Sequence, residues 1–173
     1  IETVVNISPT FGGINLEDIK APECFAIEEA LIKRLDIPVF HDDQHGTAII
    51  IAAGLLNALE ISGREIEKTH IVCLGAGAAG IAAMRMLKSL GARKIYLVDR
   101  KGVVYNGRDD VNKYKQEFSR ESSRRTLSDA MQGADVFIGV SGPNLLKPEM
   151  LKAMTANPIV FALSNPDPEI NPE

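Results

Sequence analysis

Apolar residues follow two spacings along this chain, and the alternation of the two predicts an α/β fold. Four mostly apolar runs have the length of buried strands; they are residues 71–74, 94–98, 136–140 and 159–163. The first run is followed by an apolar stripe at helical spacing, at Ile81, Met84, Leu87 and Leu90. Strands that alternate with helices predict a doubly wound parallel sheet.

The first apolar run leads directly into a glycine-rich loop of the G-x-G-x-x-G type. The loop consists of Gly75, Ala76, Gly77, Ala78, Ala79 and Gly80. Its glycines allow a sharp turn off the strand, approach of bare backbone to a pyrophosphate, and close packing of the next helix on the sheet. The N-terminus of that helix would direct unpaired N–H groups at the phosphates. The loop therefore predicts a Rossmann-like dinucleotide site, with an ordinary tight turn as the alternative.

The second apolar run ends in an acidic residue at a position typical of dinucleotide folds. Asp99 lies nineteen residues after Gly80, where such folds place the acid that binds the adenosine ribose hydroxyls. Arg100 and Lys101 follow at once and would tolerate a 2′-phosphate. The cofactor is therefore NAD or NADP, and Asp99 slightly favours NAD.

Polar loops also follow the third and fourth apolar runs. Ser141 comes after the third run and Asn165 after the fourth. Open α/β sheets bind ligands at the carboxyl ends of their strands, so we expect Ser141 at the cofactor and Asn165 in the ligand crevice. The alternative for Asn165 is a proline-stiffened turn in which its side chain bonds only to its own backbone.

Two short strand-like pieces precede the nucleotide loop, and both end in acids. The first ends in Glu17 and Asp18, and the second ends in Asp42 and Asp43. Carboxylates gathered at strand ends favour a hard cation such as Mg²⁺ or Mn²⁺. We expect Glu17, Asp18 and Asp43 to hold it, with solvated loop charges as the alternative.

Two histidines and a threonine accompany the second acidic pair. His41 and His45 would each bind a softer metal, act as a base, or simply bond to nearby backbone. Thr47 is expected to be the N-cap of a helix over residues 48–59.

Composition narrows the class of protein. Of 173 residues, 45% are hydrophobic and 24% are charged, and the net charge is −4. These values are those of a globular protein and argue against a nucleic-acid partner. The longest apolar stretch, 48–56, is too short to span a membrane. The charged segment 113–125 is expected to be a solvated face, and Cys24 and Cys73 to be buried thiols in a reducing cytoplasm.

Four motifs occur in the order in which malic enzymes carry them. They are FGGINLED from Phe11, FHDDQHGT from Phe40, GAGAAG from Gly75 and ALSNP from Ala162. On these motifs the chain resembles the short bacterial and archaeal malic enzymes over essentially its whole length. The resemblance implies oxidative decarboxylation of L-malate to pyruvate and CO₂ with reduction of NAD(P)⁺, in a homodimer.

The resemblance also implies roles for individual residues. Glu17, Asp18 and Asp43 would bind Mg²⁺ or Mn²⁺, and Asp42 would support the general base through its charge. Asn165 would lie at the substrate and nicotinamide end of the crevice. Residues 1–46 would belong to the substrate- and metal-binding domain, and residues 47–173 would form the NAD(P)-binding domain.

One feature of the family has no counterpart in this sequence. Malic enzymes use a lysine as general base and a tyrosine as general acid, both before the Phe-Gly-Gly motif. Ten residues precede Phe11, and none is Lys or Tyr. The first residue is also not Met, so we expect a central segment of a longer protein that is inactive alone. A malolactic-type enzyme with bound NAD and a non-catalytic nucleotide-binding module remain alternatives.

Overall fold

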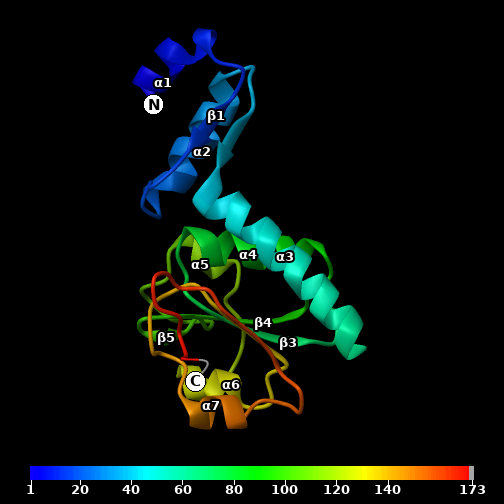
Figure 1. Cartoon of the computed structure of the whole chain (residues 1–173). Helices are drawn as coiled ribbons and strands as arrows, with labels where there is room; N and C mark the ends of the chain where they lie inside the picture. The colour runs from blue at the N-terminus through cyan, green and yellow to red at the C-terminus, as the bar shows by residue number, and fades with distance from the viewer. Residues whose placement is uncertain (172–173) are drawn as a thin grey trace.

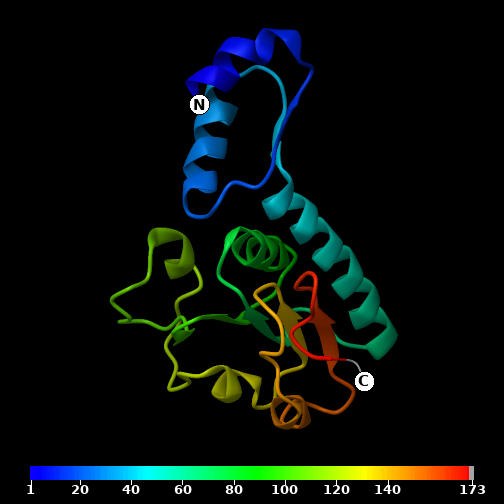
Figure 2. The same cartoon turned by 60° about the vertical axis from the view of Figure 1, so that its left-hand side comes forward.

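The computed structural model describes residues 1–171, which form two parts joined by one long helix (Figures 1 and 2). In the first part, β1 and β2 pair in parallel as a two-stranded sheet. The elements up to the joining helix are α1 (Glu2–Ile7), η1 (Ser8–Thr10), β1 (Ile14–Leu16), α2 (Glu23–Arg34), β2 (Val39–His41) and α3 (Asp42–Ser62).

The second part is built on a five-stranded sheet in the order β5-β4-β3-β6-β7. All neighbours are parallel except β4 and β5, which are antiparallel. The strands are β3 (His70–Leu74), β4 (Lys94–Asp99), β5 (Gly102–Val103), β6 (Val136–Gly139) and β7 (Ile159–Ala162). The predicted doubly wound α/β sheet is confirmed. The strand order changes direction between β3 and β6, because β4 and β5 lie on one side of β3 and β6 and β7 lie on the other.

Helices cover both faces of this sheet. In Figure 1, α3 and α4 lie on one side of the strands and α6 and α7 lie on the other. The helices of this part are α4 (Ala78–Ser89), α5 (Lys113–Gln116), α6 (Leu127–Met131) and α7 (Pro148–Lys152). Because both faces are covered, every residue of β3 is buried, which explains its unbroken apolar run.

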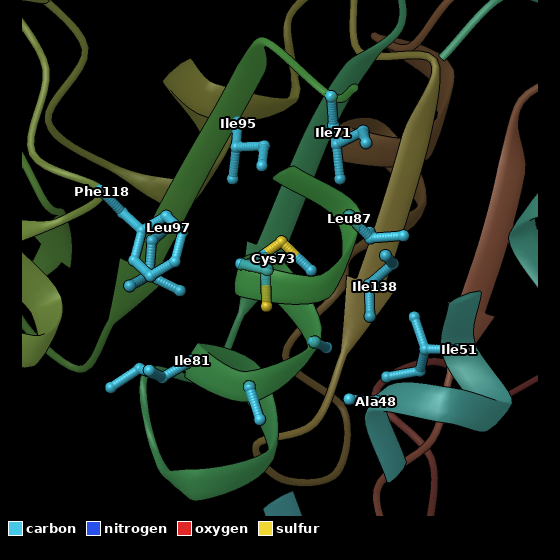
Figure 3. Close-up of a cluster of buried hydrophobic side chains, with 14 of the residues drawn as sticks. Ala48, Ile51, Ile71, Cys73, Ile81, Leu87, Ile95, Leu97, Phe118 and Ile138 are labelled. Atoms are coloured by element: carbon cyan, nitrogen blue, oxygen red, sulfur yellow. The ribbon is translucent and has the colours of Figure 1, made fainter. Parts of the chain in front are cut away.

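Alternate residues of each strand enter opposite cores. Ile71 and Cys73 of β3 point into the core under α3 and α4 (Figure 3). Val72 and Leu74 enter the core on the side of α6 and α7. Cys24 and Cys73 are buried free thiols, as expected. Burial, aided by the nearby Glu169 charge, raises the pKa of Cys73 to about 12.

The predicted start of the joining helix is wrong. The helix α3 begins at Asp42, so Thr47 lies inside it and His41 is the N-cap residue. Asp42 and Asp43 occupy the first turn, where carboxylates interact favourably with the exposed N–H groups of the helix. Gly46 leaves room for the Asp42 carboxylate in its present position, which a Cβ at residue 46 would overlap. The acids therefore open a helix instead of ending a strand.

The greater length of α3 also changes its membrane assessment. Within residues 1–171, it is the one helix long and apolar enough to cross a membrane by length and composition alone. Core helices of globular proteins meet the same criterion, and α3 buries Ile51, Leu55 and Leu59 in the core shared with α4 and the sheet, although only 28% of its apolar stretch is buried. The finding is therefore weak support for a membrane segment.

The charged segment 113–125 is less solvated than predicted. Tyr114 and Phe118 are buried, and Tyr114 packs on Phe25 of α2 with ring centroids 4.3 Å apart. This contact ties the first part of the chain to the second. The predicted domain 47–173 includes Pro172 and Glu173, which lie outside the described residues.

A buried histidine at the start of β3 makes stability depend on pH. His70 is 2% exposed, and its Nδ1–H donates to the carbonyl oxygen of Gly133 at 3.0 Å. Burial, together with the positive charges of Lys94 and Arg124, lowers the pKa of His70 from 6.5 to about 4. The neutral ring is thus the form that fits the folded state.

We predict that the protein loses stability as the pH falls from about 6.5 towards 4. The depressed pKa means that His70 contributes fully above its unfolded value, and the contribution disappears as the ring must be protonated. Urea denaturation should show the free energy of unfolding falling by up to about 1.4 kcal/mol per pH unit from this residue. The variant His70→Gln should have a shallower dependence, and equal slopes would contradict the assignment.

Candidate functional site

At two positions, the glycine loop after β3 has no room for any side chain. Gly75 has φ +122°, and a Cβ there would lie 2.6 Å from the carbonyl oxygen of Val140. A Cβ at Gly80 would overlap the carbonyl oxygen of Gly75. Gly77 differs because an added Cβ would meet no protein atom within 4 Å. The loop thus packs tightly at Gly75 and Gly80 and leaves free space at Gly77, where a phosphate can approach the backbone.

The helix that follows the loop completes a phosphate cradle. Gly77 is the N-cap residue of α4, whose first turn contains Ala78, Ala79 and Gly80. Ala76 lies between the open glycine and the closed one. A 12-residue helix presents free N–H groups and the positive end of its dipole at this point. The residues present therefore fit a dinucleotide pyrophosphate.

A cavity of about 530 Å³ lies beside this loop, at the carboxyl ends of β3, β4 and β6. Its lining includes Leu74, Asp99, Arg100 and Ser141. The structure therefore brings together three of the predicted cofactor residues from strands far apart in the sequence. Such a cavity has the volume of a small-molecule site.

Asp99 does not face this cavity with a free carboxylate. Nη2 of Arg108 donates to both of its oxygens, at 2.9 and 2.8 Å, and Nζ of Lys115 donates to one at 2.6 Å. Burial opposes ionisation, but these hydrogen bonds and that of the Lys101 N–H outweigh it and hold the Asp99 pKa below its ordinary value. The acid is thus matched by two cations before any ribose arrives.

The sequence analysis missed Arg108 and Lys115. They lie nine and sixteen residues after Asp99, in polar and charged stretches that resemble solvated loops. The antiparallel turn from β4 into β5 and the short helix α5 bring them back to the end of β4. No periodicity in the sequence marks this return.

The loops after β6 and β7 are joined by another residue that the sequence analysis missed. Glu169 is fully buried, and its carboxylate accepts the backbone N–H groups of Ser141 and Ser164. Asn165 follows Ser164 directly and is exposed at the carboxyl end of β7. The structure therefore places Ser141 and Asn165 on two loops that share one carboxylate.

The acids of the first part emerge at one edge of the two-stranded sheet. Leu16 pairs with His41 in the parallel register, so Glu17 and Asp18 leave β1 where Asp43 follows β2. The Asp18 N–H donates to Oδ2 of Asp43 at 3.0 Å. The backbone thus brings the two predicted acidic ends into direct contact.

The structure does not gather these acids into a finished metal site. Among residues 1–171, no group of three or more His, Cys, Asp or Glu side chains stands ready to hold a metal ion. One oxygen of Glu17 accepts a hydrogen bond from the Asn15 amide at 3.0 Å. The carboxylates suit Mg²⁺ or Mn²⁺ by chemistry and by position on the backbone. Ligation by Glu17, Asp18 and Asp43 remains a prediction.

Asp42, the first residue of α3, does not share the contact that Asp43 makes with Asp18. It lines a cavity of about 510 Å³ together with Leu163, which precedes Ser164 at the end of β7. The acidic start of α3 and the loop that carries Asn165 thus border one cavity.

The two histidines form a polar network with Glu28 of α2, in which His41 is buried and His45 is partly exposed. The Gln44 amide nitrogen donates to Glu28 at 3.0 Å and lies 2.9 Å from Nδ1 of His41. Nε2 of His45 lies 2.6 Å from the other oxygen of Glu28. The alternative in which the histidines bond to nearby backbone is wrong, since these partners are side chains.

The network fixes which nitrogen of His41 carries its proton. Glu28 accepts from Gln44, which sets the amide nitrogen towards both Glu28 and Nδ1 of His41. Nδ1 must then accept, so Nε2 bears the hydrogen. Nε2 is fully buried, lacks a hydrogen-bond partner within residues 1–171, and lies 3.4 Å from Oδ2 of Asp43. The network therefore ends in a buried donor that lies close to a predicted metal ligand without a hydrogen bond to it.

Comparison with known proteins agrees with this geometry. The family described as "Malic enzyme, NAD binding domain" matches residues 44–172. The NADP-dependent malic enzyme of Halomonas elongata is 58% identical over 100% of this chain. The NAD-dependent malic enzyme of Geobacillus stearothermophilus is 52% identical over 100% of it. The crystal structure of an NAD-dependent malic enzyme from Thermotoga maritima covers 99% of the chain with TM-score 0.91 and 44% identity.

The chain spans less than half the length of these proteins. It covers 42% of the Halomonas protein, 37% of the Geobacillus protein and 48% of the Thermotoga chain. The similarity therefore concerns the part of them that contains the glycine loop and the two acidic motifs.

We predict that Gln44→Met destabilises the protein by about 3 kcal/mol, because it removes a donor from buried Glu28 and the partner of His41. Methionine has nearly the same volume, so the packing changes little. Urea denaturation measures the difference. The exposed Gln116 provides a matched control, and Gln116→Met should change stability by less than about 0.5 kcal/mol. Equal effects of both substitutions would show that the network contributes nothing.

Proposed function

The chain belongs to the malic enzyme family, and we propose that it supplies the cofactor-binding part of an enzyme that oxidatively decarboxylates L-malate to pyruvate and CO₂. The observation that carries this proposal is the loop closed at Gly75 and Gly80 but open at Gly77, beside the 530 Å³ cavity. When bound, NAD(P)⁺ supplies the acceptor for the hydride that leaves malate.

We expect the two halves of the dinucleotide to lie at the ends of different strands, on either side of β3 in the strand order. Gly77 and the start of α4 hold the pyrophosphate at the point where the strand order reverses. Asp99 and Arg100 would hold the adenosine half at the end of β4, and Ser141 lines the same cavity. The loop after β7, which carries Asn165, would hold the nicotinamide half. Malate would bind beyond the nicotinamide, between Asn165 and the acids at the ends of β1 and β2.

The surroundings of Asp99 favour NADP⁺ over NAD⁺. Arg108 and Lys115 already occupy the carboxylate, so it is a weaker acceptor for a ribose 2′-hydroxyl. Arg100, Lys101 and Arg125 add three more positive side chains to the cavity lining. A 2′-phosphate gains from such a field, whereas a hydroxyl does not.

Glu17, Asp18 and Asp43 would hold Mg²⁺ or Mn²⁺ where β1 ends and α3 begins. A bound divalent cation supplies a Lewis acid that favours loss of the malate hydroxyl proton and stabilises negative charge on oxygen after decarboxylation. Asp18 and Asp43 are in contact through the backbone N–H of Asp18, and Nε2 of His41 lies 3.4 Å from Oδ2 of Asp43. Asp42 adds negative charge beside this group and raises its attraction for a cation.

The test of the proposed function uses the full-length protein with L-malate, Mn²⁺ and either NADP⁺ or NAD⁺. Absorbance of the reduced nicotinamide should rise, and pyruvate should form in equal amount. We expect a higher kcat/KM for NADP⁺ than for NAD⁺. Lactate without net reduction of the cofactor would contradict the proposed reaction, and no turnover with either dinucleotide would contradict the proposed class.

We predict that Asp43→Asn separates the metal site from the cofactor site. Loss of outer groups around a metal ligand commonly costs 10 to 100-fold in affinity, so loss of a ligand charge should weaken Mn²⁺ binding by at least about tenfold. Binding of NADP⁺ should change less than about twofold, because Asp43 lies outside the glycine loop. Electron paramagnetic resonance measures free Mn²⁺, and calorimetry measures NADP⁺ binding.

The exposed Asp36 of the same chain provides the matched control. Asp36→Asn removes the same charge near the end of α2 and should leave Mn²⁺ affinity unchanged. Equal loss of Mn²⁺ and NADP⁺ binding in Asp43→Asn would contradict the division into two sites.

A further inference from the structure

Glu169 is a buried acid that the proposed chemistry does not use. Its exposed fraction is 0%, although it lies only three residues beyond Pro166 in the loop after β7. Oε1 accepts the backbone N–H of Ser141 at 2.9 Å, and Oε2 accepts that of Ser164 at 3.2 Å. Each oxygen therefore serves a different loop at the carboxyl edge of the sheet.

The sheet leaves space for this carboxylate. Gly139 is the last residue of β6, and a Cβ at this position would overlap the Glu169 carboxyl group. The backbone carbonyl of Glu169 accepts the N–H of Leu146 at 2.9 Å, which anchors the main chain as well. The residue is thus held at its backbone and at its carboxylate, between β6 and β7.

This arrangement is costly unless the carboxylate does something for its neighbours. Transfer of a carboxylate from water to a fully buried position is unfavourable without compensating hydrogen bonds or an opposite charge. Within residues 1–171, no Lys, Arg or His forms an ion pair with Glu169. The two loop N–H groups are the compensation that the structure shows. An apolar side chain would fill the same space but would leave those N–H groups without acceptors.

We propose that Glu169 is a positioning residue that fixes the loops after β6 and β7 in the arrangement that binds the nicotinamide half of the dinucleotide. The inference rests on the proposed function. The strands β4 and β5 lie on one side of β3, whereas the loops that Glu169 joins follow β6 and β7 on the other side. Ser141 of the first loop also lines the cavity that contains Asp99 and Arg100, whereas the second loop carries Asn165 away from that cavity. We therefore expect the loop after β7 to make Glu169 matter more for the nicotinamide half than for the adenosine half.

The test compares two ligands that differ only in the nicotinamide. ADP-ribose and NAD⁺, or their 2′-phosphorylated forms if these bind more tightly, are titrated by calorimetry into full-length wild-type protein and Glu169→Gln. A glutamine keeps the shape but presents an NH₂ to one of the two loop N–H groups, so one loop is released. We expect NAD⁺ affinity to fall about tenfold and ADP-ribose affinity to stay within about twofold.

Two further variants and a stability measurement separate positioning from general damage. Gly139→Ala places a methyl group against the Glu169 carboxyl and should reproduce the selective loss of NAD⁺ binding. Glu121→Gln removes the same charge at an exposed position and should bind both ligands as wild type does. The midpoint of thermal unfolding shows that each variant is folded at the titration temperature.

The possible results test the positioning role of Glu169 separately from the proposed function. Unchanged NAD⁺ affinity in Glu169→Gln and Gly139→Ala would overturn the positioning role, with the proposed function intact. Equal loss of ADP-ribose and NAD⁺ affinity would also overturn it, because Glu169 would then support the whole fold. Wild-type protein that binds neither ligand would overturn the proposed function, and this inference with it.

Discussion

The arrangement at the carboxyl edge of the sheet depends on one steric constraint, which is the lack of any space for a Cβ at Gly75 and Gly80. These positions press the turn after β3 against Val140 and the start of α4 against the turn. The helix can therefore direct its N-terminus at the edge where β3, β4 and β6 end. Gly77 is the position between them that faces open space, so the same loop is rigid on one side and accessible on the other.

Three acids with little solvent exposure of their carboxylates occur in the described part of this structure, and each is compensated in a different way. Asp99 is matched by the cations Arg108 and Lys115. Glu28 accepts from the neutral Gln44 amide and contacts His45. Glu169 accepts only backbone N–H groups among the bonds described. The cations at Asp99 make the cofactor cavity positive. The side-chain donor at Glu28 orients His41. The backbone donors at Glu169 join two loops.

The sequence predicted those features that depend on local pattern. Buried strands and the glycine loop follow from apolar runs and from sterics, so their positions were confirmed. The two acidic ends lie at one edge because parallel strands share an edge, and the Asp18 N–H bonds to Asp43. Within residues 1–171 the carboxylates are not gathered into a metal site, so that expectation stays a prediction. The start of α3 was wrong because Thr47 has a stronger local N-cap preference than His41, whereas the two acids and Gly46 decide the actual start.

Features that depend on chain reversal could not be read from the sequence. Arg108 reaches Asp99 only because β5 turns back along β4, and neither residue shares a period with the other. Glu169 is enclosed only because Gly139, thirty residues earlier, leaves room for it. In both cases the charged residue stands among polar neighbours in the sequence, as a solvent-exposed residue does. Its partner becomes its neighbour only through the tertiary structure.

The most direct test of the central claim is the dissociation constant of NADP⁺ for wild-type protein and for Gly77→Val. A valine side chain at this position extends into open space, so the fold should keep its thermal midpoint within a few degrees. The same side chain occupies the position claimed for the pyrophosphate, and binding should weaken by at least about tenfold. Unchanged affinity in a folded variant would contradict the claim that this loop holds the dinucleotide.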